Sequence, residues 1–114
     1  MSLIYKIVAD AAWERAVKVG RFDGAAVDLA DGYIHFSTAS QAQETARRHF
    51  TGQTDLVLAA FDAAAFGAAL KWEPSRDGAL FPHLYASLDP ALALQVRPLT
   101  LGADGAPYLC DLEP

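Results

Sequence analysis

Three short segments of this sequence combine residue types that can bind an anion or move a proton. The first is the segment 33–38, Tyr-Ile-His-Phe-Ser-Thr. Alternate side chains of a strand point to opposite faces, so Tyr33, His35 and Ser37 share one face. Ser37 and Thr38 also precede a predicted helix, whose first amides favour a phosphate or carboxylate. The simpler interpretation stays open, in which Thr38 only caps the helix and His35 is half exposed.

The second segment is 71–76, Lys-Trp-Glu-Pro-Ser-Arg, which places Glu73 three residues before Arg76 and beside Trp72. A carboxylate held by a guanidinium next to an aromatic ring can orient a ribose hydroxyl or stabilise a cationic transition state. The alternative is a structural ion pair, because a buried carboxylate without a partner is costly and Arg76 or Lys71 can neutralise it. Both interpretations stay open on spacing alone.

The third segment is 81–85, Phe-Pro-His-Leu-Tyr, whose alternation places Phe81, His83 and Tyr85 on one face. Aromatic rings with a histidine can sandwich a planar base or nicotinamide, or they can form a core with satisfied polar tips. The three histidines and Cys110 lack the short paired spacings of zinc sites, so no metal is expected.

Short strands and two helices must position these segments. Helices are predicted from Asp10, as the N-cap, to Gly20, and from the capping box that begins at Thr38 to about Phe50. Residues 21–32 have no clear periodicity and are read as a loop. Apolar alternation and breaking residues predict strands over 3–8, 33–36, 56–61, 70–73, 80–84, 93–99 and 108–112.

The run Leu56–Phe61 has no polar alternation, which is typical of a central strand buried on both faces, although a buried helix segment has the same pattern. Residues 63–69 can form a helical turn, and Gly102 to Gly105 resembles a hairpin turn. Together these elements predict an α+β chain.

Length and composition limit the classes of protein that this chain can represent. Its 114 residues, 53% hydrophobic and 20% charged, predict a single domain over 1–114 with a real core. No apolar run approaches the roughly 20 residues of a membrane span, and the first ten residues lack a signal-peptide pattern, so a soluble cytoplasmic protein is expected. The net charge of −5 disfavours sequence-independent nucleic-acid binding. Cys110 is the single cysteine and leaves no internal disulfide.

Motifs in all three segments, and two others, resemble a small bacterial family known as domain of unknown function 952. They are Ile4–Ile7, Asp31–Thr38, Thr45–Phe50, Trp72–Arg76 and Phe81–Tyr85, with the sequences IYKI, DGYIHFST, TARRHF, WEPSR and FPHLY. The resemblance implies an ADP-ribosyltransferase-like fold: a split, mostly antiparallel β-sandwich with a few short helices and a cleft that grips NAD. One departure is Lys6, where that superfamily often has a histidine or arginine.

The resemblance also implies roles for seven residues. The implied catalytic residues are His35, which would hydrogen-bond a cofactor ribose, and Glu73, which would orient a ribose hydroxyl. The implied cofactor-binding residues are Ser37, Thr38, Arg76, His83 and Tyr85. These roles describe an NAD-binding enzyme acting at the nicotinamide ribose, and the alternative is a non-catalytic module that binds a nucleotide or metabolite in the same cleft. An RNA 2′-phosphotransferase-like activity would require a broader basic groove.

Overall fold

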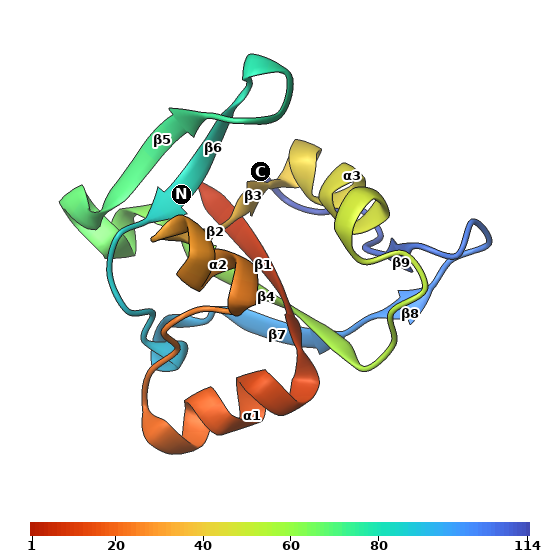
Figure 1. The fold of residues 1–114 in the computed structure, drawn as a ribbon, viewed down its shortest axis with the longest axis horizontal. Coiled ribbons are helices and arrows are strands. Elements are labelled where there is room, and N and C mark those ends of the chain that lie inside the picture. The colour runs from red at the N-terminus through yellow and green to blue at the C-terminus, as the bar shows by residue number, and fades with distance from the viewer.

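A four-stranded antiparallel sheet forms the centre of the computed structural model, which describes residues 1–114. Its strand order is β3 (Ser37–Thr38), β1 (Leu3–Ala9), β4 (Leu56–Asp62) and β7 (Gln95–Pro98) (Figure 1). β1 and β4 pair along their full length, from Leu3 opposite Asp62 to Ala9 opposite Leu56. The continuous apolar sequence of β4 follows from this central position, because both faces of the strand are buried.

Each face of this sheet packs against its own hydrophobic core. On one face Ile4, Val8 and Phe61 pack with Trp13 of α1 (Asp10–Val19). On the other face Tyr5, Ile7, Leu56 and Leu58 pack against α3 (Ala39–His49) and Leu109 near the C-terminus. The alternation along β1 therefore divides its side chains between two cores.

A second antiparallel sheet has the order β2 (Ile34–His35), β6 (Leu80–Leu84) and β5 (Leu70–Pro74). Its β5–β6 hairpin extends beyond the central sheet in Figure 1. Phe36 alone separates β2 from β3, so the chain crosses from one sheet to the other at this buried residue. A third ladder joins β8 (Thr100–Leu101) to β9 (Pro107–Tyr108).

Short helices complete the fold. α2 (Ala26–Asp31) lies in front of β2 in Figure 1, and it ends at Gly32, whose φ of 88° is the left-handed conformation that glycine tolerates best. The three 3₁₀ helices are η1 (Ala63–Ala69), η2 (Arg76–Gly78) and η3 (Pro90–Leu92). No helix combines the length and the apolar character that a membrane crossing requires.

The predicted α+β class is confirmed, with all strand pairs antiparallel and the helices short. Four details of the prediction are wrong. Residues 21–32 contain α2, whose six residues are too few to show a helical period. The N-cap of α1 is Ala9, whose backbone is extended with a ψ of 135°, and Asp10 is the first helical residue, with its N–H donating to the Asp55 carbonyl. The strand predicted at 33–36 is only Ile34–His35, and 108–112 is extended only to Tyr108.

Candidate functional site

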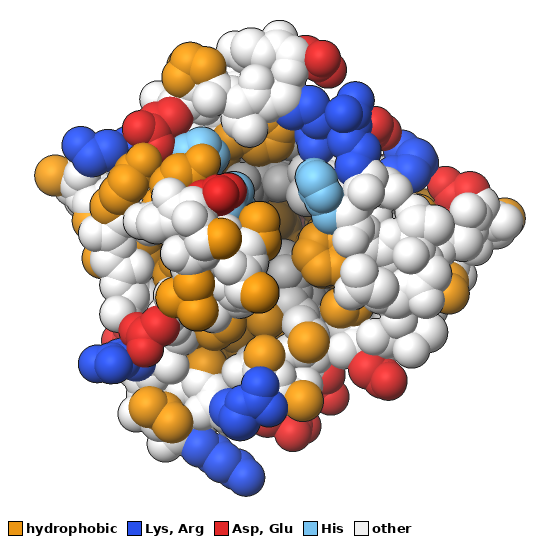
Figure 2. Space-filling view, viewed as in Figure 1, with side chains coloured by type: hydrophobic (Ala, Val, Ile, Leu, Met, Phe, Trp, Pro, Cys, Tyr) orange, Lys and Arg blue, Asp and Glu red, His pale blue; other side chains and the backbone are white.

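A cavity of about 640 Å³ opens between the two sheets, in the size range of small-molecule sites. Its walls come from β1, from α2 and the residue before it, from α3, and from the β5–β6 hairpin. Figure 2 shows a hollow with histidine side chains on either side and a group of basic side chains near its rim. The polar residues that line the cavity are Lys6, Asp31, His35, Ser37, Thr45, His49, Gln53, Ser75, Arg76 and His83.

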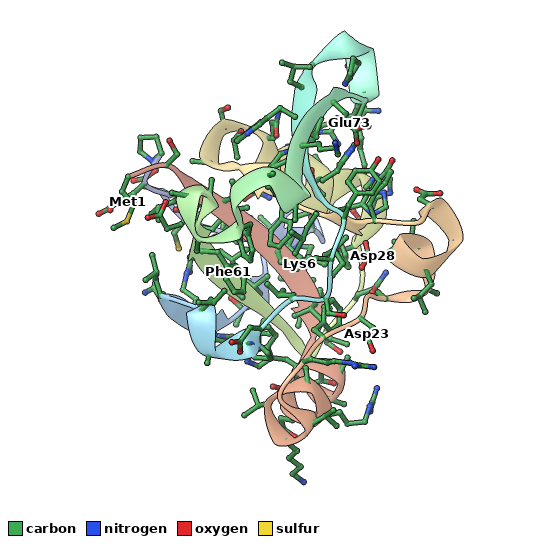
Figure 3. The ribbon with its side chains drawn as sticks, turned by 90° about the vertical axis from the view of Figure 1, so that its left-hand side faces the viewer. Met1, Lys6, Asp23, Asp28, Phe61 and Glu73 are labelled. Carbon is green, nitrogen blue, oxygen red and sulfur yellow. The ribbon has the colours of Figure 1, made fainter.

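Lys6 is a charged residue at a core position. It lies on β1 between Ile4 and Val8, whose side chains pack into one of the two cores, and it is 6% exposed. Its ammonium Nζ donates to Asp28 Oδ1 at 3.1 Å and is also 3.1 Å from Oδ2. Figure 3 shows Lys6 and Asp28 together near the middle of the molecule. Burial lowers the pKa of Lys6, and the adjacent carboxylate opposes that shift.

Asp28 is the acceptor that holds α2 against the second sheet. Besides Lys6, its carboxylate accepts from the Ala25 N–H at 2.8 Å, the His35 N–H at 3.0 Å and His35 Nδ1 at 2.6 Å. The approach requires Gly24, because a Cβ there would lie 2.8 Å from Asp28 Cβ and its φ is +123°. Burial alone raises the pKa of Asp28, but the His35 hydrogen bond and the Lys6 charge outweigh it and hold the pKa far below its usual range.

This depressed pKa predicts a loss of stability in acid. The unfolded chain binds a proton at Asp28 near pH 4, whereas the folded chain resists it, so the contribution is present above that pH and is lost as the pH falls further. We expect the carboxyl ¹³C shift of Asp28 to stay constant from pH 7 to pH 3 while the free energy of unfolding in urea declines. A carboxyl midpoint for Asp28 near pH 4 would contradict this expectation.

Both ring nitrogens of His35 contact carboxylates. Nδ1 lies 2.6 Å from Asp28 Oδ1, and Nε2 lies 2.9 Å from Asp31 Oδ2. An ionised carboxylate only accepts hydrogen bonds, so both contacts are hydrogen bonds only when the ring carries both protons. Both ring nitrogens are thus occupied by carboxylates, and neither is open to a ligand. A ligand hydroxyl would reach Nε2 by displacing Asp31, whose side chain is about half exposed.

Glu73 on β5 contacts His83 of β6 and Tyr85, the residue that follows this strand. Its Oε1 accepts from the Tyr85 hydroxyl at 2.7 Å and lies 2.9 Å from His83 Nδ1. These two hydrogen bonds, the one from Tyr85 being the larger influence, lower the pKa of Glu73. The same contact raises the pKa of Tyr85 to about 12. Glu73 is therefore an ionised acceptor held by two donors.

Tyr33 joins these groups into one aromatic wall. Its ring stacks on His83 with a centroid separation of 4.1 Å and an interplanar angle of 14°. It also lies 4.6 Å from the His35 ring and 5.2 Å from the Tyr85 ring. The sequence alternation placed Tyr33 on the same face as His35, and the pairing of His35 with His83 across β2 and β6 brings the two predicted faces together.

Arg76 has no carboxylate within 4.0 Å, although it is half buried at the cavity. Its guanidinium lies 4.9 Å from the centre of the Phe81 ring and 3.4 Å from Thr45 Oγ1. Thr45 Oγ1 is in turn 3.0 Å from Ser37 Oγ. The predicted ion pair between Glu73 and Arg76 is wrong, because η2 turns Arg76 toward α3 while Glu73 faces β6. Arg76 is thus a cation available to an anionic ligand.

The seven residues expected at the site separate into three groups. His35, Ser37, Arg76 and His83 line the cavity together. Glu73 and Tyr85 lie outside its lining: Tyr85 contacts Glu73, and Glu73 contacts the lining residue His83. Thr38 lines a separate depression beside Trp72, where its N–H donates to Gln41 Oε1 as one half of the predicted capping box.

Sequence reasoning did not find the partner of Lys6 or the hydroxyl of Thr45. Asp28 lies 22 residues from Lys6 in a segment read as a loop, and nothing local marks it as buried. A lysine between core positions of a strand was the available signal, since such a charge needs a partner. No group of three or more histidine, cysteine or acidic side chains is arranged to hold a metal ion.

The sequence was compared with models of known protein families. Residues 7–96 match the model described as "Protein of unknown function (DUF952)". The chain belongs to the DUF952 family. Among curated proteins no sequence matches the chain.

Solved structures similar to this DUF952 chain include protein CC0527 from Caulobacter crescentus. Its crystal structure is 54% identical in sequence, with a TM-score of 0.94 and 96% of each chain covered. Its solution NMR structure is 54% identical, with a TM-score of 0.87, 97% of this chain and 96% of that chain covered. Because at least 96% of each chain is covered, the similarity extends over the whole fold of this DUF952 chain.

Proposed function

We propose that the cavity binds NAD and that the protein is an ADP-ribosyltransferase-like enzyme acting at the nicotinamide ribose. The observation that carries the proposal is the convergence, in one cavity of about 640 Å³, of a histidine and tyrosine wall with an arginine that has no acidic partner. Planar rings can stack on nicotinamide or adenine, and a free guanidinium can bind a pyrophosphate in two-point fashion.

The fold is compatible with this proposal. Two antiparallel sheets flank a cleft and carry few helices, as in the split β-sandwich expected for ADP-ribosyltransferase-like proteins. In such an enzyme nicotinamide leaves the ribose through an oxocarbenium-like transition state. The cavity would contribute mainly by positioning and by charge, with Arg76 on the pyrophosphate and His35 near the ribose.

The alternative is a non-catalytic module that binds a nucleotide or metabolite in the same cavity. Its supporting observation is that Glu73 lies outside the lining and that both nitrogens of His35 are already bonded to carboxylates. Saturable NAD binding with no release of nicotinamide by the wild type would favour this module over the enzyme.

Replacing Arg76 with glutamine tests the anion-binding part of the proposal. Loss of a charge-assisted hydrogen bond to the ligand is expected to weaken NAD binding about tenfold or more in calorimetry. The matched control is Arg21→Gln, since Arg21 is exposed, pairs with Asp23 and lies outside the cavity lining. No binding by the wild type at millimolar NAD, or equal affinity in Arg76→Gln, would contradict the proposal.

A further inference from the structure

His83 differs from the other two histidines in how its ring nitrogens are engaged. Its Nδ1 contacts Glu73, while its Nε2 makes no hydrogen bond within the protein and is not sealed from solvent. The residue is nevertheless 3% exposed and lines the cavity, so the open side of the ring faces the cavity. His35 has carboxylates on both nitrogens, and His49 is an exposed residue of α3 with no side-chain partner.

The Glu73 contact determines which nitrogen of His83 carries the proton. An ionised carboxylate only accepts, so in the neutral ring Nδ1 carries the hydrogen and Nε2 presents its lone pair. Glu73 is kept ionised by the Tyr85 hydroxyl. Tyr33 stacks on the ring at 14° and fixes its plane. A carboxylate that orients an imidazole in this way leaves the far nitrogen ready to accept a proton.

We propose that His83 is the proton acceptor of this cavity and that Glu73 is its positioning residue, acting on the hydroxyl of water or of an alcohol acceptor. The reaction assigned to this pair rests on the proposed function. His83 Nε2 takes the hydroxyl proton as the oxygen bonds to C1′ of the nicotinamide ribose. The bond from C1′ to nicotinamide breaks, and its electron pair leaves with neutral nicotinamide. The proton on His83 is then released to solvent.

Charged and titratable groups surround the His83 ring. Glu73 is the one carboxylate bonded to the ring. Lys71 is the residue of β5 that pairs with His83 in the sheet register. The His35 ring lies 5.6 Å away on β2. The remaining titratable or charged groups that adjoin the ring or share its cavity are Tyr33, Tyr85, Tyr5, Lys6, Asp31, His49 and Arg76.

The test compares His83→Gln and Glu73→Gln, with Arg21→Gln, at an exposed residue outside the cavity lining, as the control. Diethyl pyrocarbonate, which acylates unprotonated imidazole nitrogens, is applied with peptide mass spectrometry, and ring ¹⁵N shifts report the tautomer. We expect His83 to react through the cavity, His35 to react at least tenfold more slowly, and Glu73→Gln to remove the preference for the Nδ1–H tautomer.

Nicotinamide release provides the second readout. General-base catalysis contributes about 100-fold or more, so His83→Gln is expected to lose at least that factor in kcat with NAD affinity within about threefold of the wild type. Glu73→Gln should lose about tenfold in kcat together with the preference of His83 for the Nδ1–H tautomer, a change that a purely structural role would not produce. The control Arg21→Gln, at an exposed residue outside the cavity lining, should change kcat less than threefold.

The two proposals fail in different ways. A His83 that resists the reagent as His35 does, an Nε2–H tautomer in the wild type, or unchanged kcat in His83→Gln would each overturn the role of His83. Absence of NAD binding by a wild type whose His83 reacts normally would overturn the proposed function alone, because reactivity and tautomer are read without NAD. Circular dichroism of each variant identifies any loss that comes from unfolding.

Discussion

Replacing Asp28 with asparagine is expected to lower the free energy of unfolding by about 3–5 kcal/mol, the range for removing one member of a buried ion pair. The variant leaves the Lys6 ammonium in a core position with no counter-charge. It also weakens the acceptor of two backbone N–H groups, from Ala25 and His35. Urea unfolding followed by circular dichroism measures the change.

Two further variants separate charge from packing. Asp23→Asn, at an exposed carboxylate that accepts from Arg21 and Ser87, should change stability by less than about 1 kcal/mol. Adding Lys6→Met to Asp28→Asn should recover much of the loss, because it removes the unpaired ammonium while preserving an oxygen acceptor at position 28. If the free energy of unfolding of Asp28→Asn lies within about 1 kcal/mol of the wild-type value, the buried pair contributes little to stability.

Replacing Phe61 with alanine is expected to destabilise the protein by about 3–5 kcal/mol, since the cavity left by a fully buried phenylalanine collapses only in part. Phe61 is 0% exposed at the centre of the core on one face of the central sheet. Its ring packs edge-on against Trp13 at 6.3 Å and Phe36 at 5.7 Å between centroids. Phe66 adds a third ring at 5.8 Å.

The Phe61 variant also tests how the core supports the candidate site. Phe36 follows His35 directly, so loosening its contact with Phe61 should reduce NAD affinity as well as stability. Phe61→Leu retains most of the side-chain volume, so its free energy of unfolding should fall by less than about 1.5 kcal/mol. The exposed control Leu80→Ala should be close to neutral. Equal stability of Phe61→Ala and Leu80→Ala would contradict this description of the core.

Local pattern in the sequence was enough to predict the strand whose two faces are both buried and the strand whose side chains alternate between two faces. Leu56–Phe61 is apolar throughout because neighbours cover both of its faces. The alternation in 81–85 predicted Phe81, His83 and Tyr85 on one face; the register of β5 and β6 confirms this for Phe81 and His83, and Tyr85 lies just beyond β6. Ala63–Ala69 is helical as predicted, although Gly67 interrupts its 3₁₀ turns.

Contacts between distant segments could not be predicted in the same way. α2 is too short to show a period, and Val27 and Leu29 on it are exposed, so its stability comes from the bonds of Asp28 rather than from an apolar face. The pairing of Glu73 with Arg76 failed because the chain leaves β5 at Pro74 and Ser75, with a ψ of −133°, departs from the strand conformation before Arg76. Spacing of three residues implies contact only where the backbone is regular.

The position of β1 in the central sheet has a consequence for how the protein folds. β1 is the first strand of the chain, yet its long partner β4 begins at Leu56, and the hydroxyl of Tyr5 donates to the carbonyl of Glu113. The central sheet therefore forms only after distant segments meet, which requires closure of long loops before much apolar surface is buried. Such non-local topologies fold on the scale of milliseconds to seconds. During that search the apolar strand β4 is without its partners, and this is the interval in which the chain is most exposed to aggregation.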